Sequence, residues 1–327
     1  MEIPPKFAIN SKVADLIALI DSNRLFINSK NIPPIVQQNI DRVSLLKSAL
    51  YSAKIEGNEL QEHNFNFYPK DQKKLEVLNI QKAINYINSE ITGTKPVILE
   101  TILTLQKISM ENIVPNAGKI RSDNLAIFNS AGVAVYFAPP PSELSIFLEK
   151  LINYINSSSA ESPIIVALIA HLILEKIHPF QDGNGRVGRL LIYAVLKAKS
   201  YNFGVPVVLE EEINKRRDEY YYHLDQGYKN VEDYLFFMLE IFYNQTETVK
   251  TQLTYIPQEN DVVLSLAPRQ GEIYNIIKDH QLVSLDFIHR RFVTVPARTL
   301  RYDLKKLQEK GLINKTSSTR GAFYRVV

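Results

Sequence analysis

The chain has 327 residues, a formal net charge of +3 and no cysteine. The lack of cysteine excludes a disulfide scaffold, cysteine-ligated zinc and iron–sulfur chemistry, and it predicts a reducing, cytoplasmic location. The length predicts two or three domains. Residues 1–12 show no basic start followed by an apolar run, so we expect no signal peptide. The apolar stretch 164–174 contains His171 and is shorter than the roughly 20 residues that a membrane span needs.

Apolar residues recur with helical spacing through most of the chain, which predicts a mainly α-helical fold. The exception is 120–138, where two short β-prone runs flank a Ser-Ala-Gly turn and predict a β-hairpin that the prolines at 139–141 end. Ser142 is expected to cap the next helix. The predicted helices are 13–23, 40–55, 75–87, 98–110, 142–155, 164–177, 184–199, 211–228 and 231–243.

The last third of the chain predicts a separate module. Residues 244–261 are polar and weakly periodic, and we interpret them as a linker. Three short helices and a strand–turn–strand then follow within 262–327, an order typical of a winged helix-turn-helix domain. Residues 261–327 carry 12 Lys/Arg and 6 Asp/Glu, hence +6, while the rest of the chain carries −3. This basic charge favours a polyanion such as DNA, although a winged helix that binds protein or dimerises is an equal alternative. The predicted DNA contacts are Arg298, Arg301, Lys305 and Arg320.

The segment HPFQDGNGRVGR, from His178 to Arg189, concentrates charge and glycine between two apolar helices. Gly183 and Gly185 permit positive φ, so that consecutive backbone N–H groups converge into a concave nest. The helix that follows directs its free N–H groups and the positive end of its dipole at the same point. Such a corner is an anion site, and phosphate is its usual occupant.

Four side chains in this segment suit phosphate chemistry. Arg186 and Arg189 lie on one side of the first helical turn, where their forks fit phosphate oxygens, and because they oppose the helix dipole they predict a compensating anion. Asp182 suits an Mg²⁺ ion held mainly by phosphates and water. His178, with an ordinary pKa of about 6.5, suits a proton acceptor. Each residue alone is more often structural, but their combination within twelve residues favours a functional site.

This segment matches in full the HPFx[DE]GNGRxxR motif, and the chain therefore resembles the Fic (filamentation induced by cAMP) family. The resemblance implies a Fic-type helical bundle whose hairpin is a target-docking flap. It also implies enzymes that transfer AMP from ATP to a protein hydroxyl, with His178 as general base and Asp182 as the ligand of Mg²⁺, or of Mn²⁺ in its place. A related subfamily, Doc, has lysine at the position of Gly185 and phosphorylates its target, so Gly185 favours AMP transfer. The implied ATP and phosphate contacts are Gly183, Asn184, Gly185, Arg186 and Arg189.

Other stretches extend the resemblance. Residues 118–121 match the family's G-x-x-R, and residues 213–224 resemble its I-x-x-x-R-x-x-Y-Y-x-x-L helix. Tyr220 and Tyr221 in that helix are candidates for an adenine pocket, with simple packing as the slightly favoured alternative. The flap residues implied to dock the target are Val133, Ala134, Val135, Tyr136 and Phe137.

The stretch SAKIEG, residues 52–57, reads by itself as a solvated helix end with a glycine cap. Beside the Fic motif it resembles the family's inhibitory [ST]-x-x-x-E-[GN] motif, formed here by Ser52, Glu56 and Gly57. The resemblance implies that Glu56 pairs with Arg189 in the γ-phosphate region and silences the enzyme. Because the stretch precedes the Fic motif, it is typical of the N-terminally inhibited class.

Together these observations predict an autoinhibited, Mg²⁺-dependent protein adenylyltransferase acting on a Tyr, Ser or Thr hydroxyl of another protein or of itself. A nucleotide-sensing DNA-binding regulator, and a Fic variant that removes AMP or phosphorylates, are the alternatives. The expected partners are ATP, a protein target and DNA, with homodimers as a further expectation. The predicted regions are 1–95 with the inhibitory helix, 96–243 as catalytic core, 244–261 as linker and 262–327 as winged helix.

Overall fold

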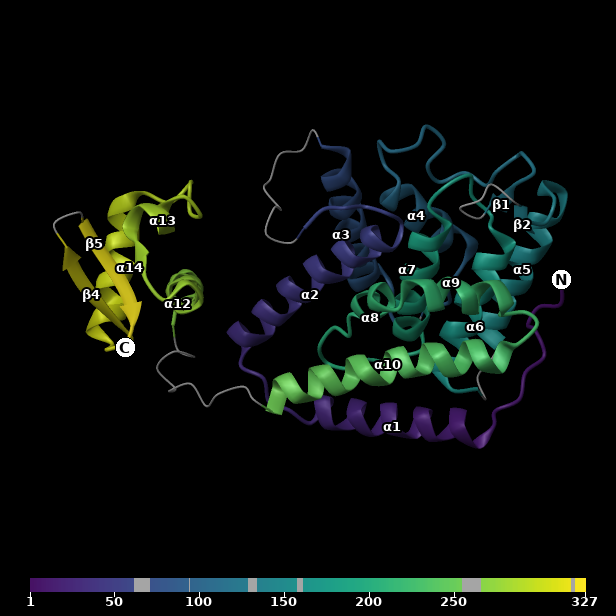
Figure 1. Cartoon of the computed structure of the whole chain (residues 1–327), viewed down its shortest axis with the longest axis horizontal. Coiled ribbons are helices and arrows are strands. Elements are labelled where there is room, and N and C mark those ends of the chain that lie inside the picture. The colour runs from purple at the N-terminus through teal and green to yellow at the C-terminus, as the bar shows by residue number, and fades with distance from the viewer. Residues whose placement is uncertain (62–70, 94, 129–133, 158–160, 255–265, 319–320) are drawn as a thin grey trace. The chain divides into compact units, whose positions relative to one another are not determined.

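The structure, a computed structural model, is mainly helical (Figure 1). Its described part divides into two units, residues 1–30 with 40–253, and residues 31–39 with 254–327. None of the helices in that part combines the length with the apolar character that a membrane crossing needs. The described residues are 1–61, 71–93, 95–128, 134–157, 161–254, 266–318 and 321–327.

The first unit confirms the predicted helices with small changes of boundary. The helix expected to be capped by Ser142 begins one residue earlier, at Pro141, because proline lacks an N–H and suits the first helical turn. The helix expected over 211–228 is divided at Arg216. The helices are α1 (Ser11–Asn28), α2 (Pro34–Ile55), α3 (Gln72–Glu90), α4 (Leu99–Ser109), α5 (Pro141–Ser157), α6 (Pro163–Ile177), α7 (Asn184–Ala198), α8 (Leu209–Lys215), α9 (Arg217–Gln226) and α10 (Val231–Thr254).

Helix α10 overturns part of the predicted linker. It continues to Thr254, so residues 244–254 are helical, whereas 255–261 lie outside the described residues. Polar side chains on the buried face of α10 conceal its periodicity: Thr246 is buried, and its hydroxyl accepts a hydrogen bond from the Asn23 amide of α1 at 3.1 Å. The wider division into domains stays a prediction.

The centre of the first unit is α6, which is buried on every side from Ile164 to Leu174, as its continuous apolar sequence predicts. It packs against α5 and α7, and α7 also contacts α3 and α4. The hairpin is confirmed as strands β1 (Ala126–Phe128) and β2 (Ala134–Phe137), which pair antiparallel with Ala126 opposite Phe137. This packing places the loop between α6 and α7 at the edge of the core.

Beyond the start of α2, the described residues of the second unit, 266–318 and 321–327, form three helices and a small sheet. Strand β5 lies between β3 and β4, and all pairs are antiparallel. The core includes Ile273, Leu300 and Leu304. The two-residue strand β3 was not predicted, because so short a segment has no readable alternation. The elements are α12 (Pro268–His280), β3 (Val283–Ser284), α13 (Leu285–His289), α14 (Ala297–Glu309), β4 (Ile313–Ser318) and β5 (Gly321–Val326).

Candidate active site

His178 ends α6 in a left-handed backbone conformation, with φ of 49° and ψ of 59°. Such angles are uncommon for a residue with a Cβ and persist where the surroundings fix them. Two contacts do so here: the backbone N–H of His178 donates to the carbonyl of Leu174 at 2.9 Å, and the fully buried ring of Phe180 anchors the loop that follows. The chain therefore leaves α6 abruptly and holds the imidazole at the edge of the core.

The imidazole of His178 is set up to accept a proton. Its Nδ1–H donates to the carbonyl of Glu175 at 3.1 Å, and since a carbonyl only accepts, Nδ1 carries the proton and Nε2 the lone pair. Burial lowers the pKa of His178 below its ordinary value, although the bond to Glu175 acts in the opposite direction. The neutral form therefore predominates at neutral pH, as a general base requires.

Arg121, the arginine of the G-x-x-R stretch, clamps this loop. Its Nε donates to the carbonyl of His178 at 2.8 Å, and its backbone N–H donates to the carbonyl of Pro179 at 2.9 Å. Its two terminal nitrogens donate to the carbonyls of Asp123 and Pro139, which flank the hairpin. The motif match indicated Arg121, but the sequence assigned it no role, because the carbonyl groups that it joins converge only in the fold.

The turn before α7 is held by its own polar atoms. Gly183 has a φ of 84°, and a Cβ there would lie 2.7 Å from the Met110 sulfur, so only glycine fits. The side chain of Asn184 accepts from the N–H of Phe180 at 2.9 Å and donates to the same residue's carbonyl at 2.8 Å. Asn184 thus reaches the predicted anion hole through its backbone, while its amide fixes the loop.

Arg186 lies in the first turn of α7 and is buried against α3 and α4. Its Nη1 contacts the Met110 sulfur at 2.9 Å, and its Nη2 lies 3.5 Å from the carboxylate of Glu76. Its buried Nε makes no hydrogen bond within the described part of the chain. Glu76 was not predicted, because nothing in the sequence of α3 distinguishes it from an ordinary surface acid.

Arg189 is only 1% exposed and is held by the end of α2. Its Nε donates to the Ser52 hydroxyl at 3.1 Å, and its Nη2 donates to the Ser52 carbonyl and to Glu56 Oε1, each at 2.9 Å. Burial acts to lower the pKa of Arg189, but the Glu56 carboxylate outweighs it and raises that pKa above its ordinary value. The pairing of Glu56 with Arg189 is therefore present, and it supplies the compensating anion that the dipole argument predicted.

The Glu56 carboxylate also covers the start of α7. A Cβ on Gly185 would lie 2.4 Å from Glu56 Oε1 and 3.3 Å from Arg189 Nη1. Gly57 follows with a φ of 95° and turns the chain away from α2. A carboxylate at this position lies at the favourable end of the helix dipole, where a phosphate would also bind.

The two tyrosines of α9 have different environments. Tyr220 is 1% exposed, and its hydroxyl lies 2.9 Å from Nε2 of the buried His171, whose Nδ1 lies 2.7 Å from the Tyr234 hydroxyl. This burial favours packing as the role of Tyr220, and its place in an adenine pocket stays a prediction. Tyr221 is 40% exposed, so its ring keeps an accessible surface.

The predicted flap is described in part. Val133 lies outside the described residues, whereas Ala134 and Val135 are in β2. The hydroxyl of Tyr136 donates to the Lys176 carbonyl at 2.7 Å, which attaches β2 to the last turn of α6. Phe137, at the end of the strand, is 74% exposed. The hairpin therefore lies beside Lys176, two residues before His178.

A metal ion would find few protein ligands here. The described residues contain no group of three or more His, Cys, Asp or Glu side chains that could hold one. Asp182 is exposed, and its Oδ1 accepts from the N–H of Gly183 at 2.5 Å. One exposed carboxylate beside an anion nest fits an Mg²⁺ ion that is bound mostly by substrate phosphates and water.

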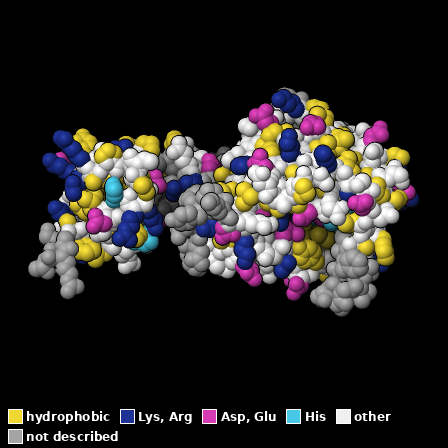
Figure 2. All heavy atoms as spheres, turned by 90° about the horizontal axis from the view of Figure 1, so that it is seen from above, with side chains coloured by type: hydrophobic (Ala, Val, Ile, Leu, Met, Phe, Trp, Pro, Cys, Tyr) yellow, Lys and Arg dark blue, Asp and Glu magenta, His cyan; other side chains and the backbone are white. Residues whose placement is uncertain are grey.

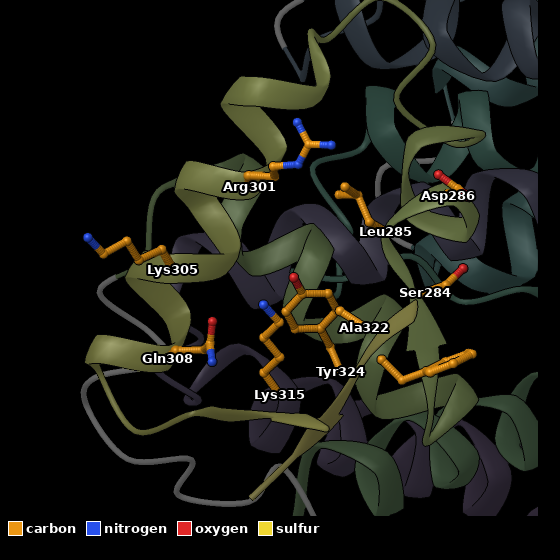
Figure 3. A pocket seen from close by; sticks show the side chains of 10 residues that line it. Ser284, Leu285, Asp286, Arg301, Lys305, Gln308, Lys315, Ala322 and Tyr324 are labelled. Atoms are coloured by element: carbon orange, nitrogen blue, oxygen red, sulfur yellow. The ribbon is translucent and has the colours of Figure 1, made fainter. Parts of the chain in front are cut away.

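The second unit has a basic cavity of its own, of about 520 Å³ (Figure 3). Arg301 and Lys305 of α14 line one side, and Lys315 and Tyr324 of the sheet line another. Dark blue Lys and Arg side chains are also frequent over this unit in Figure 2. Arg298 lies in the first turn of α14 and is exposed, whereas Arg320 lies outside the described residues.

Comparisons of sequence point to one family. Residues 96–196 match the model of the Fic/DOC family. The chain is 25% identical over 239 residues to the protein adenylyltransferase Fic of Drosophila virilis, covering 72% of this chain and 44% of that protein. It is 30% identical over 173 residues to the Drosophila mojavensis protein of the same name, covering 52% of this chain and 30% of that protein. The chain thus spans less than half the length of these curated relatives.

Solved structures show the same fold. A Fic family protein from Desulfovibrio desulfuricans G20 matches with a TM-score of 0.68 and 20% identity, covering 99% of this chain and 98% of that one. Fic-1 from C. elegans matches with a TM-score of 0.60 and 22% identity, covering 74% of this chain and 72% of that one. With its motif at the corner of α6 and α7, this chain carries a Fic/DOC family domain at residues 96–196.

Proposed function

We propose that this protein transfers AMP from ATP to a hydroxyl group of a protein and that Glu56 restrains the reaction. The observation that carries the proposal is the neutral imidazole of His178 at one end of a loop whose other end presents the start of α7, Arg186 and Arg189. A proton acceptor beside an anion site is what nucleotidyl transfer to a hydroxyl needs. The named activity of the Drosophila relatives supports the same reaction.

The chemistry follows from this arrangement. Nε2 of His178 takes the proton of the target hydroxyl, and the hydroxyl oxygen bonds to the α-phosphorus of ATP. The bond from that phosphorus to the bridging oxygen breaks, and pyrophosphate leaves. The free N–H groups at the start of α7 stabilise the charge that develops on the phosphates, together with the two arginines. Asp182 would hold an Mg²⁺ ion, which supplies further charge neutralisation on the phosphates when bound.

The hairpin is the proposed docking site for the target. Strand β2 is attached to α6 by Tyr136, and the clamp of Arg121 joins the hairpin to the His178 loop. An extended target segment paired with this hairpin would have its backbone held by strand addition, so the side chain that it carries could reach the imidazole. The proposed acceptor is the hydroxyl group of a Tyr, Ser or Thr side chain on that segment.

The restraint follows from the position of Glu56. Its carboxylate lies over Gly185 and on Arg189, which is where the terminal phosphate of ATP would otherwise lie. Two anions cannot share this site without a large electrostatic cost, so ATP binds weakly or in an unproductive pose while Glu56 is in place. Removal of the carboxylate leaves Arg189 free for the phosphate.

The test compares the full-length unchanged chain with Glu56→Gly, each incubated with ATP and Mg²⁺ together with a cell lysate. We expect the variant to attach AMP to itself or to lysate proteins at least about tenfold faster, since a hydrogen bond to a charged group is worth about 1.5–3 kcal/mol and 1.4 kcal/mol is a factor of ten. Mass spectrometry detects the added AMP. The control is Glu56→Gly with His178→Ala, which should add none. Absence of AMP from every product of Glu56→Gly, with the protein folded and ATP bound, would refute the proposal.

A second function, contact of the C-terminal unit with DNA, is favoured by the basic cavity beside α14. Arg301, Lys305 and Lys315 line it, and exposed cations of this kind bind phosphates with strong salt dependence. In a gel-shift assay at two salt concentrations, Arg301→Ala with Lys305→Ala should weaken binding about uniformly across sequences. Absence of a shift by the unchanged chain at both salt concentrations would remove DNA from the account, and equal binding by the unchanged chain and the double variant would exclude this cavity as the DNA site.

A further inference from the structure

The hydroxyl of Tyr221, on α9, donates a hydrogen bond to the backbone carbonyl of Ile55 at 3.0 Å. Ile55 is the last residue of α2 and immediately precedes Glu56. The carbonyl groups in the last turn of a helix have no partner within the helix, so an outside donor fixes their direction. Tyr221 therefore contacts the end of α2 at the residue immediately before Glu56.

The remaining contacts of this segment lie on its other sides. Arg189 of α7 binds Ser52 and Glu56, and the amide of Asn58 donates to the Lys73 carbonyl at 2.9 Å and to Glu76 at 3.0 Å. The side chain of Glu56 is 28% exposed. The backbone turns directly after it, at Gly57, whose φ is 95°. Between these anchors, the Tyr221 hydroxyl provides a hydrogen bond from α9 to the end of α2.

The surroundings of Tyr221 keep its hydroxyl a donor. Burial raises the pKa of Tyr221 above its ordinary value, and the Glu56 carboxylate raises it further. The ring packs on Tyr220 with 5.4 Å between ring centroids, which does not involve the hydroxyl, whereas the Arg217 guanidinium lies 5.6 Å from the ring and also hydrogen bonds to the hydroxyl. Removal of the hydroxyl alone should therefore leave the ring in place.

We propose that Tyr221 is a positioning residue, whose hydroxyl holds the end of α2 so that the Glu56 carboxylate reaches Arg189 and covers Gly185. The inference rests on the proposed function, since it concerns the restraint on the same site. Without the hydroxyl, Glu56 leaves Arg189 more often, and the competent population rises in proportion while it remains small. One hydrogen bond contributes about 1 kcal/mol net, so the expected rise in rate is about fivefold.

The experiment measures AMP incorporation from labelled ATP in four full-length proteins: the unchanged chain, Tyr221→Phe, Glu56→Gly and the double variant. Tyr221→Phe should be about fivefold faster than the unchanged chain and should have no effect on top of Glu56→Gly, because no carboxylate is left to position. The matched control is Tyr222→Phe. Tyr222 is the next residue and is 62% exposed, so its hydroxyl faces water, and its loss should change neither background.

Two results would overturn the inference: an unchanged or slower rate for Tyr221→Phe, or the same change of rate in both backgrounds. The second would mean that the hydroxyl serves nucleotide binding or general stability. Failure of the proposed function looks different, because Glu56→Gly would then incorporate no AMP. Hydrogen exchange separates the two without any turnover: Tyr221→Phe should speed exchange of the amides of residues 56–58 several-fold and leave α5 unchanged, and equal protection in both proteins would also refute the inference.

Discussion

The two ends of the loop between α6 and α7 differ in how they are held. At the first end, the carbonyl of Glu175, the clamp of Arg121 and the side chain of Asn184 orient His178 and its loop. All of these lie within residues 96–196, which match the family model. At the second end, the carboxylates of Glu56, directly after α2, and of Glu76, in α3, lie outside that range and contact the two arginines.

This difference teaches where control can act. The base is oriented by groups that do not involve α2, so withdrawal of Glu56 should leave the imidazole as it is. The start of α7 is covered by the Glu56 carboxylate. Under the proposed function the loop is therefore ready at one end and blocked at the other, and the predictions on Arg121, Glu56 and His178 each test one end.

The largest effect should come from the clamp at the first end. Arg121→Ala, made in the Glu56→Gly protein, removes three side-chain hydrogen bonds to backbone carbonyls and lets His178 move. We expect a fall in the rate of AMP transfer of about 100-fold with little change in the KM for ATP, because misplacement by about 1 Å has such a cost. Steady-state kinetics give both constants. A variant that loses ATP affinity instead of rate would show that the clamp serves the anion site.

At the second end, Glu56→Gly should bind ATP about tenfold more tightly than the unchanged chain, because it removes an anion from the phosphate position. Isothermal titration calorimetry with a non-hydrolysable ATP analogue measures this directly. His178→Ala serves as the control and should leave the affinity unchanged. Equal affinity of the unchanged chain and Glu56→Gly would show that the second end is not blocked.

The pH dependence of the rate should reflect the titration of the His178 imidazole, at the first end of the loop. Burial lowers the pKa of His178, and the neutral form is the active one, so the rate falls as pH drops through that lowered pKa. In Glu56→Gly the rate should therefore fall less between pH 7.5 and pH 6 than the fall of about fourfold that a histidine of ordinary pKa, about 6.5, would give. A midpoint above 6.5 in a pH–rate profile would contradict this.

The smallest expected effect is on the free energy of unfolding. Two buried groups near the loop, His171 and Glu175, make it depend on pH in opposite directions. Burial lowers the pKa of His171 from 6.5 to about 3, so stability is lost as pH falls below 6.5. Burial raises the pKa of Glu175 from 4.5 to about 7, so stability is lost as pH rises from 4.5 to 7. Between pH 4.5 and 6.5 the two effects offset each other.

Glu175→Gln removes one side of this balance. Its Tm should fall by a few degrees more than that of the unchanged chain when pH is lowered from 6.5 to 4.5. Thermal unfolding followed by circular dichroism makes the comparison. Parallel curves for the two proteins would show that Glu175 is already ionised in the folded state.

The sequence predicted much of this arrangement, because its signals are local. The apolar run of α6, the hairpin and the twelve-residue motif can each be read within a short window, and all were found in place. The pairing of Glu56 with Arg189 was available only through a family motif, since the two residues are 133 positions apart.

What escaped prediction depends on long-range contacts between ordinary residues. Glu76 is one of several acids on exposed-looking helices, and only the fold brings it to Arg186. Tyr220 and Tyr221 are neighbours in sequence, yet the helix turns one into the core and the other towards α2. The extension of α10 was missed because Gln245 and Thr246, rather than apolar residues, are buried where it begins.

The bond from Tyr136 to the Lys176 carbonyl has a consequence for the choice of acceptor. It holds β2 against the last turn of α6, two residues before His178. A paired segment advances about 3.3 Å per residue and turns alternate side chains to opposite faces, so a shift of one residue points the wrong side chain at the imidazole. Among several hydroxyls on a segment bound there, the modified one would be selected by its place in the pairing and not by the identity of its neighbours.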